Sequence, residues 1–316
     1  MENRVEINLM GGLGNQLFQI ATAYAYAISR GYKLKLPDAQ TLNVGRSRPT
    51  YWNTPLLLQF SAWHVDSYNI PKLITHSLIE SSFHYTPLNE RVITISETET
   101  SQRIRMHGYF QCWRYFDHIY DKIISDIIPV SRLGDSIREK YKSNLSALGG
   151  NTDGCCQYVS LHFRRGDYLS LDDVHPVLPV SYYENALRSI FAHPDIFNAI
   201  SVDVCILYFC EQEDIDDVMH MIRHLQRICS ADFSSLANIT FIRAPSSSDD
   251  WEQLIMMSLC DFNVIANSSF SWWGAYLQSK NRGKTCRVFY PVRWFGEKMN
   301  MQTHDLCLPE WVSVPN

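Results

Sequence analysis

The feature that most constrains this chain is a regular alternation of strand-like and helix-like segments between residues 158 and 290. Short runs rich in Val, Ile, Leu and Phe alternate with longer stretches in which apolar residues have helical spacing. Such alternation predicts a parallel β-sheet with helices on both faces, because parallel neighbours need a crossover connection. We expect strands over residues 158–163, 203–209, 239–242, 262–266 and 287–290, and helices over 181–191, 215–229, 251–260 and 272–279.

The first half of the chain begins with the same pattern and then becomes harder to interpret. We expect strands over 4–10, 33–36 and 105–110, and helices over 16–30 and 117–128. Prolines interrupt residues 40–100, which indicates loops and short elements there. A Gly-rich stretch at 144–154 is the best linker candidate. We therefore expect two α/β domains, residues 1–150 and residues 151–316, with ligands bound beyond the carboxyl ends of the strands.

The composition is that of an ordinary globular protein, with 46% hydrophobic and 19% charged residues. The net charge of −5 argues against a dedicated nucleic-acid binder. Neither a membrane-spanning run nor a signal-peptide pattern occurs, so we expect a soluble or cytoplasmic protein, or a Golgi-lumenal one if an N-terminal anchor precedes this chain. Nine cysteines, an odd number without a Cys-x-x-Cys pair, indicate reduced thiols.

The first polar motif, called here the glycine turn, is GGLGNQ at residues 11–16, between the first strand and its helix. Its glycines allow a ligand to approach the backbone, and a helix N-terminus favours anions. The same stretch is also compatible with a plain strand-to-helix turn. A third interpretation is a dinucleotide fingerprint with Asp38 as the ribose acid, although Leu17 stands where that fingerprint has a small residue.

The second motif, the arginine motif, is VSLHFRRGDY at residues 159–168. Its strand places Arg164 and Arg165 at its carboxyl end, and a guanidinium forms forked hydrogen bonds with phosphate oxygens. A fixed cation there would stabilise a departing diphosphate more in the transition state than in the ground state. The alternative is a surface ion pair of about 0–1 kcal/mol. Asp167 is expected to orient an arginine.

The third motif, the serine turn, is IANSSFSWWG at residues 265–274. A strand ends where an amide and three hydroxyls meet the start of a helix, which is a suitable cradle for a phosphate or a base edge. Trp272 and Trp273 could stack on a base, but adjacent tryptophans at a helix start are more typical of core packing. Asp214-Ile215-Asp216 has the form of a metal motif and fits better as acids in the first turn of a helix. His220 and His224 lack a third ligand nearby in the sequence.

These motifs, in this order, resemble the α-1,2-fucosyltransferases of glycosyltransferase family 11. The matching stretches are GLGNQLFQ at 12–19, GYFQ at 108–111, H-x-RRGDY at 162–168, L-x-MMS-x-C at 254–260, IANSSFSWWGA at 265–275, and a tail with YP at 290–291, WF at 294–295 and PEW at 309–311. The resemblance covers residues 5 to about 312, with little support over 40–100.

The resemblance implies a GT-B-type fold, with two facing Rossmann-like domains and a cleft between them. Residues 1–150 would form the acceptor-side domain and residues 151–316 the GDP-fucose-binding domain. The implied reaction is inverting transfer of L-fucose from GDP-β-L-fucose to a hydroxyl of an acceptor glycan, with O2 of a β-galactoside as the expected position. The resemblance implies neither a cofactor nor a metal. The oligomeric state stays open.

The resemblance also implies roles for individual residues. The catalytic candidates are Arg164, His162 and Asp167. The donor-binding candidates are Gly12, Gly14, Asn15, Gln16, His162, Arg164, Arg165, Asn267, Ser268, Ser269, Phe270 and Ser271. The chain departs from the family at residues 210–214, where it has CEQED instead of a Ser-Asp-Asp-like step. Nucleotide contacts from this loop are therefore open.

The sequence leaves alternatives for the identity of the general base and for the class of function. Asp167, His162, an acid within residues 38–100, or the donor phosphate itself could accept the proton. A dinucleotide-dependent oxidoreductase would use the glycine turn and Asp38, but it leaves the other motifs unexplained. A non-catalytic carbohydrate-binding protein would use the tryptophans for stacking and would bind glycans without releasing GDP.

Overall fold

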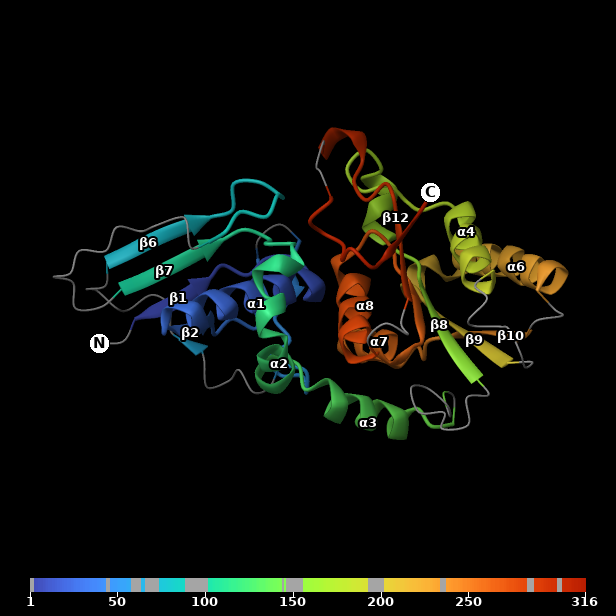
Figure 1. Cartoon of the computed structure of the whole chain (residues 1–316), viewed down its shortest axis with the longest axis horizontal. Helices are drawn as coiled ribbons and strands as arrows, with labels where there is room; N and C mark the ends of the chain where they lie inside the picture. Colours follow the sequence, from blue (N-terminus) through green and yellow to red (C-terminus); the bar gives the residue numbers. More distant parts are fainter. Residues whose placement is uncertain are drawn as a thin grey trace. The chain divides into compact units, whose positions relative to one another are not determined.

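The computed structural model describes residues 3–43, 46–57, 64–65, 74–88, 102–143, 145, 156–192, 202–233, 237–282, 287–299 and 303–316. The chain divides into two units (Figure 1). Unit 1 comprises Met1–Leu133 and Gln302–Leu308, and unit 2 comprises Gly134–Met301 and Pro309–Asn316. Within the described residues, no helix has the length and apolarity needed to cross a lipid bilayer.

Unit 1 is built on a parallel sheet with the strand order β5-β2-β1-β7-β6. Its strands are β1 (Arg4–Ile7), β2 (Lys33–Pro37), β5 (His64–Val65), β6 (Ile74–Ile79) and β7 (Gln102–His107), and a separate antiparallel pair joins β3 (Thr41–Leu42) to β4 (Arg48–Pro49). β6 lies in the stretch for which the prolines predicted only loops and short elements, and its backbone pairs with β7 along its whole length.

Helix α1 (Leu13–Arg30) packs against β1 and β2 (Figure 1). It begins three residues before the expected start, because extended Gly12 is its N-cap. It ends at Gly31, whose φ of 65° lets its N–H bond the carbonyl of Ile28 at 3.1 Å. The expected helix and both flanking strands are present, but β1 ends at Ile7, three residues before the expected end.

The helix expected over residues 117–128 is only partly right. The structure has four short elements before α3 instead: η2 (Trp113–Tyr115), η3 (Asp117–Ile119), α2 (Tyr120–Lys122) and a π-helical turn, η4 (Ile123–Ile127). The N–H of Ile128 bonds the carbonyl of Ile123 at 2.8 Å, five residues back, as in a π-bulge. Ile123, Ile127 and Ile128 are all buried.

Unit 2 contains a six-stranded parallel sheet with the order β10-β9-β8-β11-β12-β13. Its strands are β8 (Cys156–His162), β9 (Val202–Phe209), β10 (Ala237–Arg243), β11 (Phe262–Val264), β12 (Arg287–Pro291) and β13 (Val312–Val314). Its helices are α3 (Val130–Lys140, shared with unit 1), α4 (Val180–Phe191), α6 (Ile215–Asp232), α7 (Asp250–Leu259) and α8 (Ser269–Arg282). Short helical turns are η5 (Gly166–Ser170), η6 (Gln212–Asp214) and η8 (Glu297–Met299). The alternation predicted from the sequence is confirmed, and β13 is an addition too short to form a pattern.

Helices cover both faces of the unit 2 sheet, with α4 and α6 on one side and α7 and α8 on the other (Figure 1). On β8 the alternate residues Val159 and Leu161, followed by Phe163, pack with α4 and α6. The intervening residues, which include His162, therefore face α7 and α8. The α/β class and two units with parallel sheets agree with the expected fold, whereas a cleft between facing domains stays a prediction.

Residues after 133 belong to unit 2 because the end of α3 is tied to α7. Glu252 accepts hydrogen bonds from Lys140 Nζ at 2.6 Å and from the Tyr141 hydroxyl at 2.7 Å. It also forms the capping box with Asp249 that the sequence predicts. The sequence placed the boundary in the Gly-rich stretch 144–154, which lies outside the described residues except for Leu145.

Candidate active site

His162 is the last residue of β8 and is buried on the α7/α8 side of the sheet. Its ring lies 5.6 Å from the ring of Phe270, measured between centroids. Burial, with a smaller contribution from the nearby Arg164 charge, lowers the pKa of His162 to about 3. The imidazole is therefore neutral near pH 7. Its Nδ1 is buried and has no hydrogen-bond partner among the described residues.

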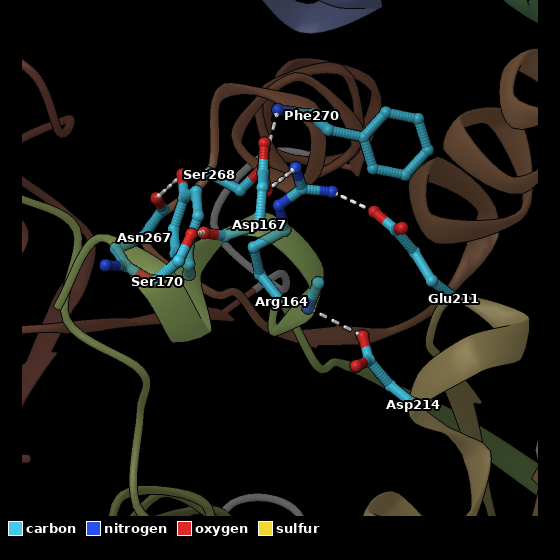
Figure 2. Close-up of polar contacts among 10 residues, drawn as sticks. Arg164, Asp167, Ser170, Glu211, Asp214, Asn267, Ser268 and Phe270 are labelled. Carbon is cyan, nitrogen blue, oxygen red and sulfur yellow. Dashed lines mark hydrogen bonds and ion pairs between the residues drawn. The ribbon is translucent and has the colours of Figure 1, made fainter.

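Arg164 lies just beyond β8, and its guanidinium is held by two carboxylates (Figure 2). Its Nη2 is 2.5 Å from Asp167 Oδ1, and its Nη1 bonds Glu211, which follows β9. The guanidinium also lies over the ring of Tyr168, 5.1 Å from the centroid. Burial opposes the charge of Arg164, but Glu211, Tyr168 and Asp167 outweigh it, and its pKa is raised. Arg164 is a fixed cation at the carboxyl edge of the sheet.

The turn after Arg164 is attached to the loop that follows β9. Gly166 has a φ of +36°, and its N–H donates to Asp214 Oδ2 at 2.9 Å (Figure 2). A Cβ at Gly166 would come within 3.2 Å of the Glu211 carboxylate. Asp214 thus closes a structural hydrogen bond, while Asp216 supplies an acid to the first turn of α6, as the sequence predicted.

Arg165 points to a different partner. Its Nη2 lies 2.7 Å from Asp217 Oδ2 on α6. The side chains of Arg164 and Arg165 are equally buried, at 18% exposure each. Arg165 therefore ties its turn to α6, and Arg164 alone of the pair is bracketed by Asp167 and Glu211.

The serine turn joins β11 to α8 and is anchored by the side chain of Asn267. The Asn267 amide nitrogen donates to the carbonyls of Pro176 at 2.9 Å and Trp294 at 3.0 Å. Ser268 caps α8, since its Oγ accepts from the Phe270 N–H at 3.4 Å (Figure 2). The Tyr168 hydroxyl donates to the Asn267 carbonyl at 3.1 Å, so the arginine motif and the serine turn meet.

The remaining residues of the serine turn differ in burial: some lie on its partly exposed side and others lie in the core. Ser269 and Phe270 are half-buried, whereas Ser271 is fully buried with its hydroxyl donating to the Ser268 carbonyl at 3.4 Å. Trp272 and Trp273 have no exposed surface. Core packing of both tryptophans is confirmed, and neither is accessible for stacking on a base.

The glycine turn belongs to unit 1 and is organised from inside by Gln16. This buried side chain donates to the carbonyls of Gly11 at 3.0 Å and Pro49 at 2.8 Å. Asn15 accepts from Gln111 Nε2 at 2.8 Å. A Cβ at Gly12 would meet nothing within 4 Å, so the backbone there is accessible.

Two histidine groupings have partners that a metal site would also use. His224 Nε2 lies 3.3 Å from Glu184 Oε2, and His220 is exposed. Among the described residues, the ligand atoms of His84, His304 and Asp305 lie within 4.8 Å of one another. The Asp305 carboxylate already accepts from the Tyr85 N–H at 3.0 Å and from Arg114 at 3.2 Å.

Glu211, Asp214 and Tyr168 belong to the site but are not among the residues that the sequence predicts for it. The sequence singles out Glu211 only as part of the CEQED stretch, and it singles out Asp214 there and in the Asp-x-Asp pattern. Both residues reach the site because β9 lies beside β8. A signal for them was present, since neighbouring parallel strands end at the same edge and this loop is acidic.

Comparison with known proteins identifies relatives along almost the whole chain. The model of Glycosyl transferase family 11 matches residues 69–315. An alpha-1,2-colitosyltransferase of Escherichia coli is 27% identical, covering 98% of each chain. A galactoside alpha-(1,2)-fucosyltransferase 2 of Oryctolagus cuniculus is 23% identical, covering 98% of this chain and 76% of its own. The solved structure of Arabidopsis thaliana FUT1 with GDP superposes with a TM-score of 0.48 at 13% identity, covering 88% of this chain and 69% of that one.

Proposed function

Because this chain belongs to glycosyl transferase family 11, we propose that it transfers L-fucose from GDP-β-L-fucose to O2 of a β-galactoside in an acceptor glycan. Inversion at the anomeric carbon would make the product an α-fucoside. The names of relatives support this choice, since galactoside α-1,2-fucosyltransferases match 98% of this chain. The oxidoreductase alternative finds no support in the family match.

The observation that carries the proposal is the position of Arg164 at the carboxyl edge of the unit 2 sheet. Tyr168 links it to the serine turn, because the Tyr168 ring contacts the guanidinium and its hydroxyl bonds the Asn267 carbonyl. A diphosphate bound between Arg164 and the start of α8 would meet a fixed cation and helix N–H groups. These two features suit an anionic leaving group.

In this mechanism the chain lowers the barrier mainly at the leaving group. Charge builds on the diphosphate as the glycosidic bond breaks, and Arg164 is already in place to stabilise it. Neutral His162 would donate or accept one hydrogen bond and would add no charge.

The proton of the acceptor hydroxyl needs a base other than His162. A group with a pKa of about 3 is a weak base near neutral pH. Asp167 is occupied with Arg164 and orients it. We propose that the proton goes to the departing phosphate oxygen late in the displacement.

A second candidate is transfer of colitose, because the E. coli relative named for that sugar is 27% identical over 98% of the chain. The decisive experiment is a GDP-release assay with either GDP-fucose or the matching GDP-colitose as donor and a panel of β- and α-galactosides as acceptors, followed by linkage analysis of the product. Acceptor-dependent GDP release and an α-1,2 linkage would support the proposal. Release only with the colitosyl donor would support the second candidate, and glycan binding without GDP release would overturn both.

A further inference from the structure

The guanidinium of Arg164 carries one positive charge, and the carboxylates that contact it carry more negative charge than that. Asp167 and Glu211 each bring a carboxylate to it, and neutral His162 adds no positive charge. Arg165, the next cation along the chain, is already paired with Asp217 at 2.7 Å. If both carboxylates stayed on Arg164, they would repel an approaching diphosphate. One carboxylate therefore has to move away from the guanidinium before the diphosphate binds.

The two carboxylates differ in how firmly they are held. Asp167 lies in η5, three residues after Arg164, and its backbone carbonyl accepts from Ser170 Oγ at 2.9 Å (Figure 2). Glu211 has a longer side chain that is 43% exposed, against 30% for Asp167. Its backbone is fixed separately, because the Glu211 carbonyl accepts from the Asp214 N–H at 3.2 Å. The Glu211 side chain can therefore turn into water while its loop stays in place.

We propose that Glu211 is an internal competitor of the donor diphosphate, which holds Arg164 in the empty site and is displaced when the nucleotide binds. When GDP leaves after transfer, Glu211 takes Arg164 back and so favours product release. This inference depends on the proposed function, since it requires a nucleotide diphosphate as the ligand of Arg164. It assigns a role to the acidic loop at residues 210–214.

The test compares GDP affinity in three full-length proteins: wild type, Glu211→Gln and Glu213→Gln. Glutamine keeps the size of Glu211 and removes its charge, so the competition weakens. Glu213→Gln removes the same charge from an exposed position in the same loop and controls for the general field. Calorimetry should show that Glu211→Gln binds GDP roughly tenfold more tightly than wild type does. The affinity of Glu213→Gln for GDP should stay within about twofold of the wild-type affinity.

Guanosine, which has no phosphate, separates charge competition from a change in pocket shape. Its affinity should be the same in wild type and Glu211→Gln, and stopped-flow measurements should show slower GDP release from the variant. Unchanged or weaker GDP binding by Glu211→Gln, or equal tightening by Glu213→Gln, would overturn the inference while leaving the proposed function intact. Absence of GDP binding by wild type would instead overturn the proposed function, and the inference with it.

Discussion

The hydroxyl of Tyr168 donates a hydrogen bond to the backbone carbonyl of Asn267 over 3.1 Å, across 99 residues of sequence. The same ring contacts Arg164 and stacks on His175 with its centroid 4.7 Å away. One side chain thus connects the turn after β8 to the turn after β11. The relation between the arginine and the start of α8 is set by this contact.

Replacing Arg164 by alanine is expected to lower turnover by about a hundredfold or more, which corresponds to about 3 kcal/mol of transition-state stabilisation. The control is Arg165→Ala, because both arginines are equally buried and each pairs with acids. Arg165→Ala should affect thermal stability more than turnover. Steady-state kinetics of GDP release decides, and the roles are reversed if Arg165→Ala loses transfer while Arg164→Ala retains it.

Chelation should leave turnover unchanged, because the proposed leaving-group cation is a guanidinium. The assay is GDP release after dialysis against EDTA, with and without added Mn²⁺ or Mg²⁺. Loss of activity on chelation and recovery with Mn²⁺ would contradict a metal-independent mechanism.

Buried His162 is expected to make the protein less stable in mild acid. Its ordinary pKa of 6.5 falls to about 3 in the folded chain because of burial. Below pH 6.5 the unfolded chain therefore binds a proton that the folded chain excludes, and stability is lost as the pH falls toward about 3. This residue alone contributes a slope of up to about 1.4 kcal/mol per pH unit.

Urea unfolding of wild type and His162→Gln between pH 7 and pH 4 measures that slope by difference. The variant should show a weaker loss of stability in acid. His220→Gln, which removes an exposed histidine from α6, should follow wild type. Parallel curves for wild type and His162→Gln would show that His162 is protonated in the folded chain.

Replacing Glu252 by alanine should destabilise unit 2 by about 1–3 kcal/mol, because the buried Tyr141 hydroxyl loses its acceptor and the more exposed Lys140 and Asp249 N–H lose theirs. The side chain is 3% exposed and accepts from Lys140, Tyr141 and the Asp249 N–H. Denaturant unfolding is the measurement, with Glu310→Ala as an exposed control. A change below about 1 kcal/mol would mean that these three bonds contribute little.

Gly274 allows α8 to approach α7 closely, so Gly274→Ala should lower the free energy of unfolding by about 1–3 kcal/mol. A Cβ there would lie 2.6 Å from the Met257 Cβ. The better helix propensity of alanine offsets only about 1 kcal/mol of the clash. Gly12→Ala is the control, since its Cβ meets nothing within 4 Å. Thermal melts would contradict this reasoning if Gly274→Ala were as stable as wild type.

Much of unit 2 could be predicted from the sequence because its signals are local. Strand-like runs and helical spacing are legible over a few residues each, and the Asp249–Glu252 capping box needs only its four positions. The position of Arg164 also followed, since parallel strands end at one edge. The π-helical turn at Ile123–Ile127 did not follow, because the burial of its isoleucines depends on distant partners.

The sequence by itself determined which elements form in unit 2 and that Arg164 and the serine turn follow strands. Only the tertiary structure decided that Glu211 would hold Arg164, because this depends on β9 lying beside β8. It also decided that His162 is neutral and that the Asn267 amide holds Pro176 and Trp294. Strand order and burial arise from contacts between distant segments, and no local pattern of residues encodes them.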